Sequence, residues 1–112
     1  MTEQQYRQAT ERTWNVKYNP MTPKEQELSN IAMGIGGEAG ELVDMAKKVI
    51  HHGHEMNKLE LIKELGDLDY YLTRLKIFYG ISTEEVRKAN VMKLHARYPE
   101  GFNSEDSINR EL

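Results

Sequence analysis

The sequence contains no cysteine and no long apolar stretch. The lack of cysteine excludes disulfide bonds, thiolate metal sites and a cysteine nucleophile. No window approaches the roughly 18 apolar residues that a membrane-spanning helix requires. The N-terminal run Met-Thr-Glu-Gln-Gln-Tyr-Arg also lacks the apolar stretch of a signal peptide. We therefore expect a cytoplasmic protein that does not associate with membranes.

A strong charge of one sign is also missing, because the formal net charge is only −3 and no basic block occurs. This balance argues against general binding to nucleic acids or membrane surfaces. The 112 residues suffice for one domain with a modest core, since 38% of them are hydrophobic and 29% are charged. A second copy of the chain would supply apolar area that so small a domain lacks, which favours a homodimer.

Helical periodicity runs through most of the sequence, and no β-strand pattern occurs. Four helices are predicted, over residues 3 to about 15, 23 to about 50, 58 to 79 and 83 to 98. Capping signals precede the last three of them, at Thr22, Asn57 and Ser82. Helices with short connections and no sheet predict an all-α fold, a four-helix bundle-like single domain over residues 1–104 that is completed by dimerisation. A polar tail, 105–112, follows it.

Glycine is concentrated in the second predicted helix, at positions 34, 36, 37 and 40. Each glycine costs up to about 1 kcal/mol relative to alanine in a helix interior. We therefore expect a kink, a break, or the close approach of another backbone or a ligand in this stretch.

Two acidic pairs lie on the second and third predicted helices, Glu38 with Glu41 and Glu64 with Asp67. Carboxylates three residues apart share a helix face, so two such helices packed side by side can bring four carboxylates together. On both helices the acids border the apolar stripe and do not oppose it. Like charges repel and lose hydration at short distance, so this cluster needs a cation or shared protons.

Ligands that offer only oxygen favour a hard divalent ion, magnesium or manganese. Redox di-iron bundles use Glu-x-x-His pairs, which these pairs are not. Magnesium commonly takes further ligands from substrate phosphates, and Asn90, Lys93 and Arg97 share one face of the fourth predicted helix, where they can hold phosphate oxygens. The plain alternative is surface acids paired with lysines such as Lys48 or Lys63, and a solvated basic strip.

Histidine and tryptophan offer two further candidates. His51, His52 and His54 lie in a glycine-containing turn without cysteine, which argues against a zinc site, since polar connections often collect such residues; contact with a substrate or a partner subunit is the alternative. Trp14 has the helical spacing of a core residue, but it can also stack on a nucleobase. We therefore keep Trp14 as a candidate for a base pocket.

Four runs of residues occur in a characteristic order: Gly37-Glu38-Ala39-Gly40-Glu41-Leu42, Glu64-Leu65-Gly66-Asp67, Ala89-Asn90-Val91-Met92-Lys93-Leu94 and Arg97-Tyr98-Pro99-Glu100-Gly101-Phe102. Together they resemble the MazG-like nucleoside triphosphate pyrophosphohydrolases, over about residues 4 to 104. The resemblance implies an all-α NTP pyrophosphatase fold and a dimer or a dimer of dimers. It also implies magnesium-dependent hydrolysis of a nucleoside triphosphate to the monophosphate and pyrophosphate. The family's metal-binding and phosphate-contacting residues fall on Glu38, Glu41, Glu64, Asp67, Asn90 and Lys93.

Many relatives carry two adjacent acids at the start of the first pair, whereas Gly37 precedes Glu38 here. The number of metal ions therefore stays open. For catalysis we assign Glu41, with Glu38 beside it, to orient or deprotonate the water that attacks the α-phosphorus. The preferred nucleobase does not follow from the resemblance. Two alternatives remain, a nucleotide-binding regulatory module with negligible turnover and a purely structural dimerising bundle.

Overall fold

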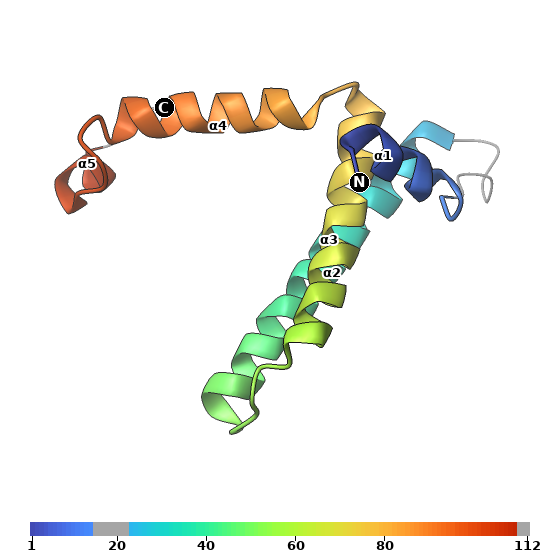
Figure 1. Cartoon of the computed structure of the whole chain (residues 1–112), viewed down its shortest axis with the longest axis horizontal. Helices are drawn as coiled ribbons and strands as arrows, with labels where there is room; N and C mark the ends of the chain where they lie inside the picture. The colour runs from blue at the N-terminus through green and yellow to red at the C-terminus, as the bar shows by residue number, and fades with distance from the viewer. Residues whose placement is uncertain (15–22, 110–112) are drawn as a thin grey trace. The chain divides into compact units, whose positions relative to one another are not determined.

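The computed structural model describes residues 1–14 and 23–109, which contain α-helices and no β-strand. The described helices are α1 (Glu3–Glu11), α2 (Pro23–His51), α3 (Lys58–Tyr79), α4 (Thr83–Arg97) and α5 (Ser104–Ile108) (Figure 1). The predicted all-α fold is confirmed. Within the described residues, no helix combines the length and the apolarity needed to cross a membrane.

The chain divides into two compact units, Met1–Tyr79 and Gly80–Leu112, which are described separately. The predicted domain limit at residue 104 and the predicted dimer remain predictions. The polar tail contains one element that the sequence pattern did not indicate, the short helix α5. Its start is fixed by Asn103, whose Oδ1 accepts a hydrogen bond from the backbone N–H of Asp106 at 2.7 Å.

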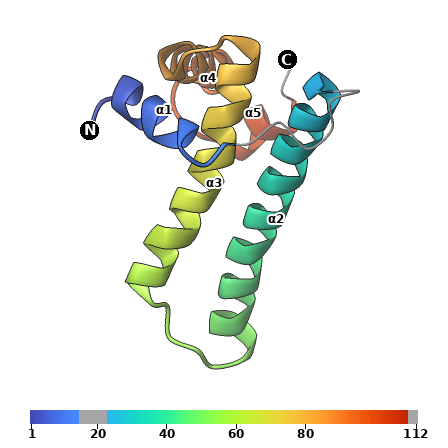
Figure 2. The same cartoon turned by 90° about the vertical axis from the view of Figure 1, so that its right-hand side faces the viewer.

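The first unit is a helical hairpin with a third helix packed on one end. Helices α2 and α3 lie side by side and antiparallel, and α1 packs across the end of α3 (Figure 2). The core is small, because Ile31 is the one fully buried apolar side chain among the described residues. Three polar side chains are buried with it, namely Thr10, Thr73 and Arg74. Because so small a core contributes little stability, burial of exposed apolar side chains against another surface would stabilise this unit.

The helix boundaries follow local capping chemistry. The Oδ1 of Asn57 accepts from the Glu60 N–H at 3.1 Å, and the Oγ of Ser82 accepts from the Glu85 N–H at 3.0 Å, as predicted. Between them, Gly80 adopts a φ of 66°, the left-handed conformation that ends α3. The predicted cap Thr22 lies outside the described residues.

The predicted extent of the first helix is wrong at its C-terminal end. Helix α1 stops at Glu11 and not near residue 15, because Thr13 and Trp14 form a turn whose backbone N–H groups both reach the carbonyl of Thr10. This turn brings Thr13 and Trp14 against the hairpin, where they contact residues of α3.

Helix α2 runs unbroken through its glycines, so the predicted break is wrong. At Gly34 the approaching group is a side chain and not the expected backbone or ligand, because the ring of Tyr71 occupies the space that a Cβ atom would need. A Cβ atom at residues 36, 37 or 40 would meet nothing within 4 Å. Only the first of these glycines is therefore required by packing within the first unit.

The second unit carries the run of residues 97–102 as a turn after α4. The N–H of Gly101, which has a φ of 90°, donates to the Tyr98 carbonyl at 3.1 Å. This turn brings the rings of Tyr98 and Phe102 to a centroid distance of 5.4 Å. A cavity of about 510 Å³ lies between this turn and α4.

Candidate functional site

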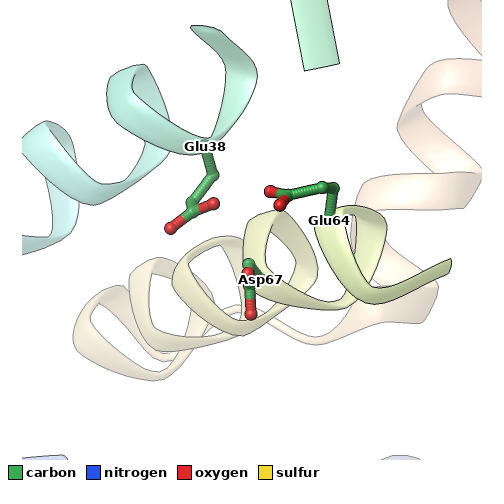
Figure 3. Close-up of side chains that lie close together, drawn as sticks. All are labelled: Glu38, Glu64 and Asp67. Carbon is green, nitrogen blue, oxygen red and sulfur yellow. The ribbon is translucent and has the colours of Figure 1, made fainter. Parts of the chain in front are cut away.

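Three carboxylates converge between α2 and α3. One oxygen from each of Glu38, Glu64 and Asp67 lies within 4.8 Å of the oxygens of the other two. Glu38 extends from α2 toward Glu64 on α3, and Asp67 lies one turn further along α3 (Figure 3). Two of the three side chains are half-buried, and that of Asp67 is exposed. Among the described residues this is the one group of three or more metal-ligating side chains that meet.

Among the described residues, no ion pair compensates the charges of this cluster. Burial, and then the negative charges of Asp67 and Glu64, raise the pKa of Glu38 above the ordinary value for a glutamate. The Oε2 atom of Glu64 is buried and has no hydrogen-bond partner among the described residues. A buried carboxylate oxygen without a donor is costly, and a hard cation is the partner that this oxygen-only set fits.

The lysines considered as plain surface partners bind other acids. Lys48 pairs with Asp44 at 2.9 Å and Lys63 pairs with Glu60 at 3.6 Å, both within one helix. The pair with Asp44 lowers the pKa of that carboxyl and raises the pKa of Lys48. Exposed pairs of this kind contribute little to stability. They also leave the converging carboxylates without a lysine partner among the described residues.

The fourth predicted ligand, Glu41, is not part of the group that meets. Three residues along α2 from Glu38, it is displaced by about 4.5 Å along the helix axis and is exposed. It lines a cavity of about 290 Å³ that also includes Glu64, Lys48 and His54. Glu41 therefore borders the cluster through Glu64, and its roles as ligand and base remain predictions.

A second cavity, of about 370 Å³, opens beside the carboxylates. It is lined by Thr13, Glu38, Asp67, Tyr70 and Tyr71. The hydroxyl groups of the threonine and of Tyr70 are hydrogen-bonded at 2.6 Å. We name this space the Thr13 cavity. It places hydroxyl groups and an aromatic ring next to two of the three converging acids.

The hydroxyl and aromatic residues of the Thr13 cavity were not among the site residues predicted from the sequence. A signal existed for Tyr71, because it follows Asp67 by four residues and so lies on the same face of α3. No local signal points to Thr13, which is 57 residues from its partner Tyr70. Only the folded chain brings these two together.

Trp14, the candidate for a base pocket, contacts the tyrosines of the Thr13 cavity. Its ring lies 5.9 Å from that of Tyr70 and 6.2 Å from that of Tyr71, between centroids. Its Nε1–H donates to Glu27 of α2 at 3.1 Å, and the guanidinium of Arg74 lies 4.8 Å from its ring. Trp14 therefore supports the cavity wall, and direct contact with a nucleobase remains a prediction.

The predicted phosphate-binding residues lie on α4, in the second unit. Asn90, Lys93 and Arg97 have the spacing of one helix face, and the first two are exposed. Arg97 is half-buried, and its Nε has no hydrogen-bond partner among the described residues. These residues belong to the second compact unit and the carboxylates to the first, so the approach of the two groups remains a prediction.

The histidines lie at the tip of the hairpin. The rings of His52 and His54 are 6.5 Å apart between centroids, and His54 lines the cavity that contains Glu41. They do not belong to the one metal-ligating group found within the described part of the chain. This placement keeps contact with a substrate or partner as their predicted role.

Comparison with known proteins gives a family match over most of the chain. Residues 26–102 match the model of the MazG nucleotide pyrophosphohydrolase domain. The chain is also similar to the gene 37 protein of Mycobacterium phage L5, with 31% identity over 87 residues that cover 74% of this chain and 76% of the phage protein. No solved structure matches the chain significantly. The matched range contains the three carboxylates and begins after Thr13 and Trp14.

Proposed function

The chain belongs to the MazG nucleotide pyrophosphohydrolase family, and from this premise we propose that it hydrolyses a nucleoside triphosphate to the monophosphate and pyrophosphate. The observation that carries the proposal is the meeting of Glu38, Glu64 and Asp67, with a buried oxygen of Glu64 that lacks a donor. Such a site is unfavourable for a purely structural bundle. It fits an enzyme whose substrate arrives with a divalent cation.

We assign Glu38, Glu64 and Asp67 as the residues that hold Mg²⁺ or Mn²⁺. Their oxygens lie within 4.8 Å of one another, which allows a single cation to contact all three after small side-chain rotations. A bound divalent cation supplies charge neutralisation for the phosphates and lowers the pKa of a coordinated water. Without a cation, the raised pKa of Glu38 partly relieves the repulsion by retaining its proton.

Glu41 is the residue assigned to orient or deprotonate the attacking water. It is exposed and lies beside Glu64 in the neighbouring cavity, so it remains available when the other three acids bind the cation. The oxygen of the water bonds to the α-phosphorus, the bond from this phosphorus to the bridging oxygen breaks, and pyrophosphate leaves. The water's proton passes to the Glu41 carboxylate.

Asn90, Lys93 and Arg97 are assigned to the phosphates of the substrate. An amide, an ammonium and a guanidinium on one face of α4 can together hold oxygens that the cation does not contact. The buried Nε–H of Arg97 has no partner among the described residues, and a phosphate oxygen that reaches it would supply one. The assignment requires α4 of the same chain or of a second copy to face the acids in the active assembly.

We further propose that the active protein is a homodimer or a dimer of dimers. The hairpin exposes a row of apolar side chains on the outside of α2 and α3, with 74% of Met33, 68% of Val43, 71% of Ile50, 60% of Leu59 and 54% of Ile62 accessible. Gly36 and Gly40 lie in the same row of α2, where a second helix can approach closely. Burial of this surface would add to the small core of the first unit.

The direct test is an assay for pyrophosphate and orthophosphate release from ribo- and deoxynucleoside triphosphates with Mg²⁺ or Mn²⁺. We expect pyrophosphate only, dependence on the metal, and a loss of at least about 100-fold in Glu64→Gln. The matched control is Glu84→Gln, an exposed acid of α4. Saturable metal-dependent binding without product would favour the regulatory module, and the absence of both binding and turnover would favour the structural bundle.

A further inference from the structure

The wall of the Thr13 cavity contains a pair of hydroxyl groups that the fold itself does not require. Thr13 lies in the turn after α1 and Tyr70 lies on α3, and their hydroxyl oxygens are 2.6 Å apart. Thr13 is exposed and Tyr70 is half-buried, so the pair faces the cavity at the surface of the unit. A solvent-accessible hydrogen bond between neutral groups contributes little to stability.

Thr13 is held in place from within the first unit. Its N–H and its hydroxyl both reach the carbonyl of Thr10, each at 3.4 Å. Thr10 is only 2% exposed, and its Oγ1 accepts from the Nη1 of Arg74 at 3.0 Å. The same guanidinium, which is buried, binds Glu11 at 2.7 Å. The turn that carries the Thr13 hydroxyl is therefore anchored to α3 before any ligand binds.

Tyr70 is held from its other side by aromatic contacts. Its ring lies 5.2 Å from that of Tyr71 in an edge-to-face arrangement and 5.9 Å from that of Trp14. The Tyr71 ring in turn rests against Gly34, where no side chain can intervene. Both hydroxyl groups are thus fixed relative to the acids of the cavity, which gives them the preorganisation of a recognition element.

The order of groups in a nucleoside triphosphate determines what this pair meets. The α-phosphate must lie at the carboxylates for the proposed reaction, and the sugar is bonded directly to it. Glu38 and Asp67 share the Thr13 cavity with the hydroxyl pair, and its described lining includes no basic side chain that would hold the β- and γ-phosphates, so we place the sugar there. Because the Thr13 hydroxyl donates to the Thr10 carbonyl, the Tyr70 hydroxyl donates to Thr13, and the pair keeps free lone pairs that can accept a hydrogen bond from a sugar hydroxyl.

We propose that Thr13 and Tyr70 form a specificity-determining pair that hydrogen-bonds a sugar hydroxyl of the substrate. The proposal rests on the proposed function, since it takes the position of the α-phosphate from it. The 2′-hydroxyl and the 3′-hydroxyl share the required chemistry. Substrates that differ only in these two groups distinguish them.

The test compares three nucleoside triphosphates with one base and a ribose, a 2′-deoxyribose or a 2′,3′-dideoxyribose. The kcat/KM for pyrophosphate release is measured with Mg²⁺ for the wild type, Tyr70→Phe and Thr13→Val. Each variant removes one hydroxyl and keeps the size of the side chain. For a substrate that carries the recognised hydroxyl we expect a loss of roughly two- to tenfold, and for one that lacks it no change.

The substrate that escapes the loss identifies the group that is read. A loss with both the ribose and the deoxyribose substrates, but not with the dideoxyribose one, assigns the 3′-hydroxyl. A loss with the ribose substrate alone assigns the 2′-hydroxyl. Thr13→Ser keeps the hydroxyl and should behave as the wild type, and Tyr79→Phe is the matched control on the exposed end of α3.

Equal losses with all three substrates, or no loss with any, would overturn the proposal, because the hydroxyl pair would then be only structural. If the wild type releases no pyrophosphate, the proposed function fails, and Mg²⁺-dependent binding of the same three nucleotides tests the pair by the same comparison. Equal binding by the wild type and both variants would then overturn it. Far-UV circular dichroism and melting confirm that each variant is folded.

Discussion

Helix α3 carries a buried arginine, Arg74, and a half-buried glutamate, Glu64, whose surroundings differ. Toward its C-terminal end, Arg74 is paired with Glu11, hydrogen-bonded to Thr10 and placed over the Trp14 ring, so its charge is compensated although its buried Nε lacks a hydrogen-bond partner among the described residues. In the middle, Glu64 meets two further carboxylates, and one of its buried oxygens has no donor among the described residues. A compensated buried charge stabilises the fold, whereas a cluster of like charges without a partner destabilises it until a cation binds.

Removal of the compensated charge should have the largest effect on stability. We expect Arg74→Met to lower the free energy of unfolding by about 3 kcal/mol, because it separates α1 from α3 and leaves Thr10 buried without its donor. Urea denaturation measures this change. Glu11→Gln is the comparison and should cost less than Arg74→Met, since the glutamine side chain keeps an oxygen that accepts from the guanidinium. Equal costs for both would contradict the assignment of Arg74 as the anchor.

The contact of Gly34 on α2 with Tyr71 on α3 lies between the region of Arg74 and that of the carboxylates. A methyl group at residue 34 would overlap the tyrosine ring, so we expect Gly34→Ala to destabilise the protein by about 2 kcal/mol despite the higher helix propensity of alanine. Gly37→Ala, which meets nothing within 4 Å in the chain, is the matched control and should be neutral or stabilising when the protein is monomeric. Thermal melting distinguishes the two. A neutral Gly34→Ala would mean that the ring moves freely.

Removal of one uncompensated charge should have the opposite sign. In metal-free protein at pH 7 we expect Glu38→Gln to raise the free energy of unfolding by about 1 kcal/mol, because it relieves repulsion from Asp67 and Glu64. Because the pKa of Glu38 is raised in the folded protein, protonation of this carboxyl stabilises the wild type, and the full effect is present below the ordinary glutamate pKa. That stability is lost as the pH rises through the raised value. The advantage of the variant should therefore vanish at acidic pH.

Urea titrations from pH 4 to pH 8 provide the measurement for that prediction. An advantage of Glu38→Gln that is independent of pH would contradict it, because the substitution would then act through packing and not through charge. Asp44→Asn is a useful comparison. The pKa of Asp44 is lowered by Lys48, so its carboxylate stabilises the fold above the ordinary aspartate pKa and loses this effect in acid.

The helix boundaries and the meeting of three acids were predictable from the sequence because both depend on interactions between residues a few positions apart. Asn57 and Ser82 act on backbone N–H groups three residues away, and the carboxylates of Glu64 and Asp67 share a face through the helical repeat. Interactions of this range are visible in the sequence. They account for the all-α fold and for three of the four acids that were expected to meet.

The remaining features depend on contacts between distant segments. Glu41 does not meet the other acids, although it has the same three-residue spacing from Glu38 that Asp67 has from Glu64, so the shared helix face alone did not decide which acids meet. The pairing of Thr13 with Tyr70 and the burial of Arg74 both require the turn that ends α1 to pack on α3. No residue near these positions in the sequence signals that contact. The wall of the Thr13 cavity was therefore not predictable from periodicity or capping.

The central claim, that Glu38, Glu64 and Asp67 form a divalent-cation site, is tested most directly by thermal melting during a Mg²⁺ titration. At a concentration about tenfold above the dissociation constant, the wild type should gain about 1.4 kcal/mol, or roughly 5 °C in Tm. Glu64→Gln should gain much less, and Glu84→Gln should behave as the wild type. No rise in the wild type, or an equal rise in wild type and Glu64→Gln, would contradict the claim.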